Sequence, residues 1–242
     1  MRAASGTGSS EPAAHFGGFP PDTLRYLRDL RENNEKSWFE AHRGEYERLY
    51  VEPARTFVTA AGELLAGLAP AIRAEPRILG SIFRINRDTR FGADKRPYKD
   101  HIDFWFWEGA RARAVSGFFL RLSPDFVGLG AGSHGFDGDQ LERFRKALTR
   151  GETAGELTAA ASSLEAAGYR LSGEHYARTP RGYEAASPRA AMLLRHRALF
   201  VHQDLPVEEA LDGARLLASC RRQWSSLAPL HRWLVDNVQA AG

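Results

Sequence analysis

The side chains best suited to chemistry gather between positions 84 and 103 of this 242-residue chain. This charged segment holds ten charged side chains in twenty positions, whereas charged residues make up 26% of the whole chain. Its cations are Arg84, Arg87, Arg90, Lys95, Arg96 and Lys99, and its anions are Asp88, Asp94, Asp100 and Asp103. The segment therefore supplies a net charge of +2, most of the formal total of +3.

Surplus positive charge in a short segment favours a site for an anion. An arginine guanidinium matches the planar geometry of a phosphate or carboxylate, and a lysine ammonium adds a compact charge. We therefore expect a phosphate-bearing small molecule to contact these cations: Arg84, Arg87, Arg90, Lys95 and Lys99.

The aspartates of the charged segment have two interpretations. Asp88 and Asp94 could each neutralise a neighbouring arginine and brace the loop, which is the favoured interpretation. They could instead serve as a general base or bind a divalent metal, with Tyr98 as a proton donor. Whether the protein is an enzyme is left open, and no particular cofactor is indicated.

Other sites of chemistry have little support. The eight histidines show no HxH, HxxxH or HExxH spacing and no CxxC is present, so no metal site is predicted. A metal site assembled from distant residues, for example His101 with Asp100 or Asp103, is a less favoured alternative. Cys220, the one cysteine, lies in an apolar helical pattern and is expected to pack in the core. The glycine-rich residues 128–135 match neither common phosphate-loop pattern, so a tight turn between a strand and a helix is favoured.

Composition limits the class of protein. The apolar fraction of 43% is that of a soluble globular protein, and the length suffices for one large domain. A single cysteine allows no internal disulfide, which fits a reducing compartment. No secretory signal and no apolar stretch long enough to span a membrane is evident, so we expect a cytoplasmic protein.

The elements that must position these residues follow an α+β order. Residues 1–18 lack periodicity and are expected to form a disordered tail, and residues 19–242 a single domain. Apolar spacing predicts helices over 19–34, 35–50 and 54–72 with an interruption at Pro53, and later over 138–150, 152–168 and 189–197. Alternating or β-branched runs predict strands over 78–86, 101–107, 115–123, 126–132 and 198–205. The C-terminal residues 206–239 predict one or two helices broken near Pro229. The expected fold is an antiparallel meander flanked by N- and C-terminal helices.

Several of these stretches, in the same order, resemble a bacterial and fungal family catalogued as domain of unknown function 2461. The matching motifs are LRDLRENNEKSWFEAHRGEYE, FRINRDTRFGADKRPYK, GFFLRLSP, GLGAG, LERFRKAL, TPRGY and LAPLHRWL. One departure is Ser187 before Pro188, where the family tends to carry histidine. The resemblance implies a single cytoplasmic α+β domain and assigns no activity.

Three hypotheses about function result. The leading one is a protein that binds a phosphate-bearing ligand at the charged segment, and its aspartates leave open whether it is also an enzyme. A nucleic-acid-binding module is an alternative, in which the cations spread over an exposed face and affinity falls steeply with salt. A structural or partner-binding protein is the third, in which the cations are consumed in pairs with aspartate.

Overall fold

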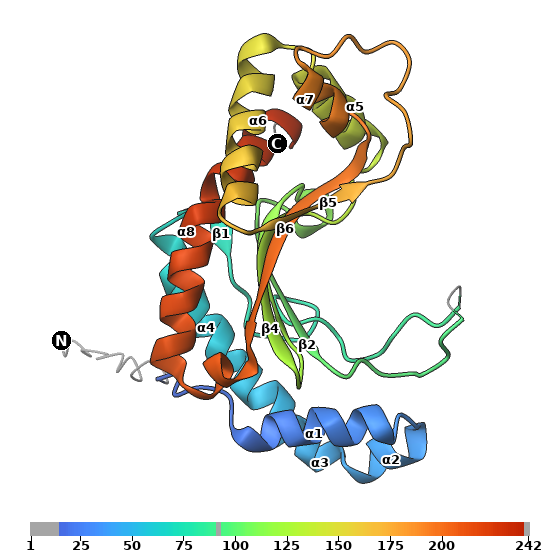
Figure 1. Cartoon of the computed structure of the whole chain (residues 1–242). Coiled ribbons are helices and arrows are strands. Elements are labelled where there is room, and N and C mark those ends of the chain that lie inside the picture. The colour runs from blue at the N-terminus through green and yellow to red at the C-terminus, as the bar shows by residue number, and fades with distance from the viewer. Residues whose placement is uncertain (1–14, 91–92, 240–242) are drawn as a thin grey trace, which may run out of the picture.

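The computed structural model describes residues 15–90 and 93–239 (Figure 1). Its centre is a six-stranded antiparallel sheet in the order β1-β2-β3-β4-β6-β5. The strands are β1 (Ile72–Arg73), β2 (Ile102–Glu108), β3 (Gly117–Leu122), β4 (Phe126–Ser133), β5 (Arg170–Glu174) and β6 (His196–Pro206). Helices flank the sheet, so the predicted α+β class is confirmed.

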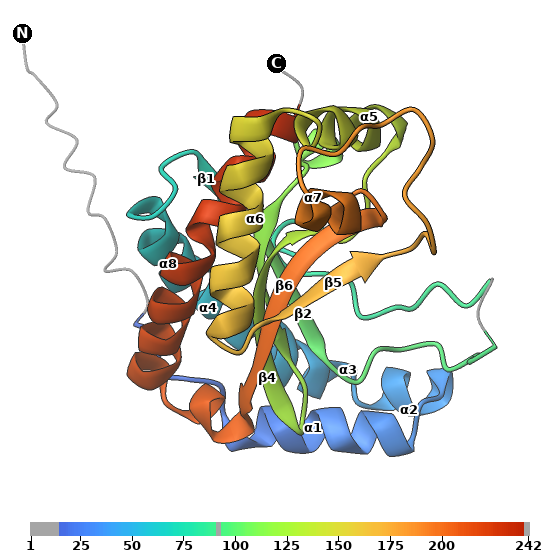
Figure 2. The same ribbon diagram turned by 45° about the horizontal axis from the view of Figure 1, so that its top comes forward.

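The sheet has one apolar face that forms the core. The strand register aligns Phe104 with Leu120 and Leu120 with Leu129, and none of the three is more than 1% exposed. Helices α4 (Glu52–Ala66) and α8 (Gly213–Val238) lie along this face (Figures 1 and 2). The alternate side chains of the same strands therefore point to the opposite face.

Helix α8 continues without a break through Pro229, where the sequence predicted a break. A proline inside a helix removes one backbone hydrogen bond and costs about 3 kcal/mol. Trp224, Leu227 and Leu230 around it are fully buried, and burying each such side chain contributes about 1.5–3 kcal/mol. Burial of this face therefore outweighs the local cost of the proline.

The N-terminal helices form a layer at one end of the sheet. They are α1 (Pro21–Glu32), α2 (Lys36–Ala41), α3 (Arg43–Glu45) and a π-helical turn (Tyr46–Val51) that leads into α4. Pro53 lies in the first turn of α4 and does not interrupt the chain, because the first turn needs no backbone donor there.

Packing begins before the predicted domain boundary at residue 19. Phe16, inside the stretch predicted as a tail, is only 2% exposed and packs edge-on against Phe19 and Phe57. One isolated phenylalanine among small residues carries no periodicity, so this contact could not be predicted from a sequence pattern. Residues 1–14 of the predicted tail lie outside the described residues.

A second group of helices gathers near β5 at the other end of the sheet (Figure 1). It consists of α5 (Gly138–Ala147), α6 (Gly151–Ala166) and α7 (Pro188–Leu193), and short 3₁₀ turns occur at Arg111–Arg113 and Val207–Leu211. Ser187, the residue that departs from the family pattern, caps α7 by accepting a hydrogen bond from the Ala190 amide at 3.1 Å. Of the described helices, none is long and apolar enough to cross a membrane.

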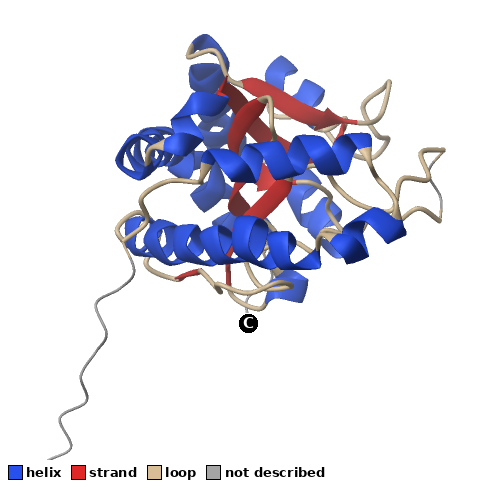
Figure 3. Ribbon diagram, turned by 90° about the horizontal axis from the view of Figure 1, so that it is seen from below, coloured by secondary structure: helices blue, strands red, loops and turns tan. Residues whose placement is uncertain are grey.

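The predicted strand over 78–86 is wrong. This stretch makes single bridges rather than a strand ladder: Ile78 to Ile82, Ile82 to Phe104 and Asn86 to Tyr98. Beyond Ile82 the chain leaves the sheet and returns at residue 101, and Figures 1 and 3 show this excursion extending away from the body. We call its described residues, 84–90 and 93–100, the arm. Its dense charge and Pro97 do not suit a place inside a sheet.

Candidate functional site

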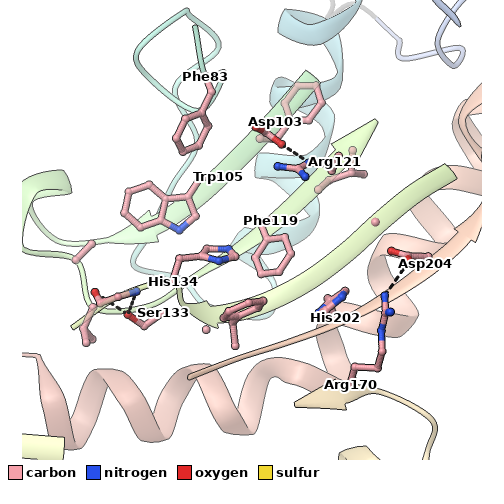
Figure 4. A pocket seen from close by; sticks show the side chains of 18 of the residues that line it. Phe83, Asp103, Trp105, Phe119, Arg121, Ser133, His134, Arg170, His202 and Asp204 are labelled. Carbon is pink, nitrogen blue, oxygen red and sulfur yellow. Dashed lines mark hydrogen bonds and ion pairs between the residues drawn. The ribbon is translucent and has the colours of Figure 1, made fainter. Parts of the chain in front are cut away.

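The face of the sheet turned away from α4 and α8 carries an open cleft of about 750 Å³ (Figure 4). Cross-strand pairing sets its side chains in rows. One row contains Asp103, Arg121, Gly128 and Asp204, and the next contains Trp105, Phe119, Gly130, His202 and Arg170. A volume of this size suits a small organic ligand.

Glycines of β4 hollow out the middle of the cleft. Gly128, Gly130 and Gly132 alternate along the strand and share this face. A Cβ added at Gly130 would lie 2.6 Å from a ring carbon of Phe119, closer than the 3.0 Å that such atoms keep. The Phe119 ring therefore occupies the space that a side chain at Gly130 would need.

Aromatic rings wall the cleft on the side of Gly132. His134 follows the end of β4, and its ring centroid lies 4.9 Å from that of Phe119 and 4.3 Å from that of Phe200. Trp105 and Phe83 also line the cleft (Figure 4). Such surfaces offer stacking contacts to a flat, apolar part of a ligand.

Asp103 is the most strongly held ionised group of the site. Its carboxylate accepts hydrogen bonds from Arg121 Nε at 2.7 Å and from Lys99 Nζ at 2.9 Å, and His101 Nε2 lies 3.3 Å away. Burial alone would raise the pKa of Asp103, but the hydrogen bonds and charges of His101, Arg121 and Lys99 outweigh it and lower that pKa well below its usual range. Asp103 is therefore a fixed anion at neutral pH.

Arg121 is positioned by this carboxylate and still faces the cleft. Its side chain is 46% exposed, and its hydrogen bond to Asp103 uses Nε. Among the described residues, its terminal nitrogens have no hydrogen-bonding partner. A guanidinium held at Nε presents both terminal nitrogens as a fork for a carboxylate or phosphate.

A second ion pair lies at the other edge of the cleft. Arg170 of β5 donates to Asp204 of β6 at 2.8 Å (Figure 4). His202 stands between this pair and the glycines, and its Nδ1 is buried without a hydrogen-bonding partner in the described structure. Burial, and then the charge of Arg170, lowers the pKa of His202.

His134 is held neutral in the same way. Burial of its ring is the main cause that lowers its pKa, and the charge of Arg121 adds to it. Both histidines are therefore neutral at pH 7, where a ring nitrogen can accept a proton or a hydrogen bond.

A chain of ion pairs ties Asp103 to the N-terminal helices. His101 Nδ1 lies 3.0 Å from Asp100, and Asp100 accepts from Arg31 of α1 at 2.7 Å. Arg31 also donates to Asp125 at 2.7 Å. These contacts tie residues 100 and 101, at the base of the arm, to α1, which in turn is bound to Asp125. They help to fix the position of Asp103 and, through it, of Arg121.

The predicted aspartates lie in pairs on the arm. Asp94 accepts from Arg96 at 2.7 Å and from Arg87 at 2.6 Å, and these bonds lower its pKa. Asp88 accepts from Arg90 at 2.7 Å, which lowers its pKa too. Asp94 therefore links the two limbs of the arm through Arg87, whereas Asp88 pairs with Arg90, two residues away.

The other residues predicted for the site lie in three places: on the arm, against the N-terminal helices and beside the cleft. Lys95 donates to the Thr89 carbonyl at 2.9 Å, and the Arg84 side chain is exposed to solvent. Tyr98 stacks on Phe39 at 4.3 Å on the side of the N-terminal helices, and burial raises its pKa. Lys99 donates to Asp103, a residue of the cleft.

Sequence reasoning did not single out Arg121, His134, Arg170 or His202. A signal was present, because Arg121 alternates with apolar residues in GFFLRLS and His202 does so in ALFVHQDL. Alternation identifies one polar face on each strand. It cannot show that β4 pairs with β6, some 70 residues later, to bring those faces together.

Metal and thiol chemistry have no support in the part of the chain that the structure describes. It contains no group of three or more His, Cys, Asp or Glu side chains that could hold a metal ion. Cys220 is fully buried, and burial raises the pKa of its thiol, so it packs in the core as predicted.

These features define an α+β protein with a ligand-sized cleft on one face of a single antiparallel sheet. A family model described as conserved hypothetical protein (DUF2461) matches residues 22–233, so the chain belongs to this family, as its motifs predicted. No curated protein and no solved structure matches the chain. Its function has to be argued from the chemistry of the cleft.

Proposed function

We propose that the cleft binds a small ligand with one anionic group, such as a phosphate, and one flat apolar part. The observation that carries this proposal is Arg121, held at Nε by Asp103 with its terminal nitrogens turned to an aromatic-lined cavity. An arginine fixed in this way loses little side-chain freedom on binding, which favours affinity.

The charge balance around Asp103 supports an anionic ligand. The basic side chains of Lys99 and Arg121 share this one carboxylate. Asp204, the other acid that lines the cleft, is already paired with Arg170. A ligand phosphate or carboxylate at Arg121 would supply the missing negative charge in a partly desolvated site, where ion pairing is stronger than in water.

The arm has a different part in this proposal. Its arginines lie beside Asp88 and Asp94, so we assign those aspartates to bracing and the arm to holding Lys99, His101 and Asp103 in place. A nucleic-acid interface has less support, because most arm cations are already matched by carboxylates.

Neutral His134 and His202 leave acid–base chemistry on the bound ligand open. The low cysteine content supports a cytoplasmic location.

Calorimetric titration with phenyl phosphate and with phenol, which shares the ring and is neutral at pH 7, tests the proposal. We expect phenyl phosphate to bind at least tenfold more tightly than phenol, and Arg121→Gln to remove this difference. Arg25→Gln, at an exposed arginine of α1 that is also paired with an aspartate, Asp22, is the matched control and should change nothing. Equal binding of the two probes, or an unchanged preference in Arg121→Gln, would sink the proposal.

A further inference from the structure

Two ion pairs face each other across the cleft. Asp103 of β2 and Arg121 of β3 form one, and Asp204 of β6 and Arg170 of β5 form the other (Figure 4). Gly128 of β4 lies between the pairs, because it is aligned with Arg121 on one side and with Asp204 on the other. The missing side chain of this glycine leaves a gap with a cation on one side and a carboxylate on the other.

The gap over Gly128 has a defined width. Neighbouring strands lie about 4.8 Å apart, so the backbones at Arg121 and Asp204 are separated by about 10 Å. A Cβ added at Gly128 would lie 3.3 Å from Asp204 Oδ1 and 3.7 Å from Arg121 Cβ. The Asp204 carboxylate therefore leans over Gly128, and no side chain of β4 separates it from Arg121.

One oxygen of Asp204 is available to a ligand. Arg170 donates to Oδ2 at 2.8 Å and balances the charge of the carboxylate. Among the described residues, Oδ1 has no hydrogen-bonding partner, and the side chain is 43% exposed. An ionised carboxylate has lone pairs for about four hydrogen bonds. Asp204 can therefore accept a hydrogen bond from a neutral hydroxyl group without a second positive charge beside it.

The flat surfaces of the cleft lie in the next row of side chains. Trp105 and Phe119 are each two residues from Asp103 and Arg121 on the same strands, a separation of about 7 Å. A ligand with its phosphate at Arg121 reaches the rings through a connecting unit, and the gap over Gly128 lies beside this path.

We infer that a hydroxyl-bearing sugar joins the phosphate of the ligand to its flat part, as in a nucleoside monophosphate, and that Asp204 binds the sugar hydroxyls. The phosphate lies at Arg121, the sugar over Gly128 and the ring against Phe119. An acidic side chain binds ribose hydroxyls in the same manner in dinucleotide-binding folds. This inference rests on the proposed function and specifies the ligand of the same site.

Calorimetric titration of the full chain with adenosine 5′-monophosphate and with its 2′,3′-dideoxy analogue tests the inference. We expect the dideoxy analogue to bind at least tenfold more weakly, because a hydrogen bond to an ionised group is stronger than one between neutral groups. Asp204→Ala should reduce this ratio of affinities to less than threefold. Arg170→Gln, which leaves the carboxylate in place, is the matched control and should keep the ratio above tenfold.

The ratio is the quantity to compare, because the arginine released by Asp204→Ala would change the affinity for both nucleotides alike. Equal affinity of the two nucleotides for the wild type, or an unchanged ratio in Asp204→Ala, would overturn the inference. Phenyl phosphate carries no hydroxyl, so its preference over phenol and the loss of that preference in Arg121→Gln test the proposed function separately.

Gly128→Ala provides a second test within the gap. The added methyl would lie 3.3 Å from Asp204 Oδ1, so it displaces this oxygen and takes up space under the sugar. We expect the affinity for adenosine 5′-monophosphate to fall at least tenfold and that for phenyl phosphate to change less than threefold. Gly44→Ala, whose Cβ meets nothing within 4 Å, is the control. Unchanged nucleotide affinity in Gly128→Ala would contradict a sugar that lies over Gly128.

Discussion

Replacing Gly130 with alanine perturbs the floor of the cleft at its tightest point. The added methyl would meet the Phe119 ring at 2.6 Å or less, and also the Val201 carbonyl of the neighbouring strand. A ring can rotate away, but a backbone carbonyl of a paired strand moves only if the sheet moves. We expect Gly130→Ala to lower the free energy of unfolding by about 3 kcal/mol, the upper range for overpacking. For a chain of this length that corresponds to a melting temperature lower by about 6–12 °C.

Gly128→Ala is the matched control, on the same strand and the same face. Its Cβ would lie 3.3 Å from an Asp204 carboxylate oxygen and 3.4 Å from a Phe126 ring carbon, both of which are side-chain atoms that can yield slightly. The reduced freedom of the unfolded chain offsets this crowding by about 0.4–1 kcal/mol. Differential scanning calorimetry of the two variants measures the contrast. If Gly130→Ala melts within 2 °C of Gly128→Ala, the close packing of Phe119 over Gly130 is not as described.

Three further predictions concern stability. Asp103→Asn should cost about 2 kcal/mol at pH 7, measured by urea unfolding, since charged hydrogen bonds are lost. Folding lowers the pKa of Asp103, so the ionised carboxylate stabilises the folded protein above pH 4, and this stabilisation is lost as the pH falls. The difference in free energy of unfolding between wild type and Asp103→Asn should therefore narrow below pH 4. A constant difference would contradict this role. Pro229→Ala should raise stability by about 1–2 kcal/mol, because an exposed proline inside α8 gives way to a residue with a backbone donor; a loss of stability would show that the ring has a packing role. Ser187→Ala should cost about 1 kcal/mol through loss of the α7 cap, whereas Ser187→Thr should cost less, and equal losses would argue against capping.

The strands of the sheet centre could be predicted from local patterns. In IDFWFWE and GFFLRL, residues alternate between a core face and an open face, and both segments are strands within two residues of the expected bounds. The same logic failed at 78–86, where Ile82 and Ile85 are buried but the chain makes only single bridges. Apolar alternation shows which side chains are buried, and it does not show whether a neighbouring strand continues alongside.

The charged segment illustrates the other limit of the sequence. Its composition favoured pairing for Asp88 and Asp94, and each does accept a hydrogen bond from an arginine two residues away. The same composition drew attention to the arm and away from Arg121, one isolated charge in an apolar strand. Arg121 becomes a candidate only when Asp103, from an adjacent strand, holds it beside glycines and rings contributed by distant segments.

The most direct test of the central claim is where an anionic ligand perturbs the protein. In a titration of ¹⁵N-labelled protein with phenyl phosphate, followed by nuclear magnetic resonance, the Trp105 indole signal and the amides of β3 and β4 around Arg121 and Gly130 should shift. The amides of arm residues 86–90 and 93–96 should stay unchanged. Shifts confined to the arm, with Trp105 and β4 unaffected, would contradict the assignment of ligand binding to the cleft.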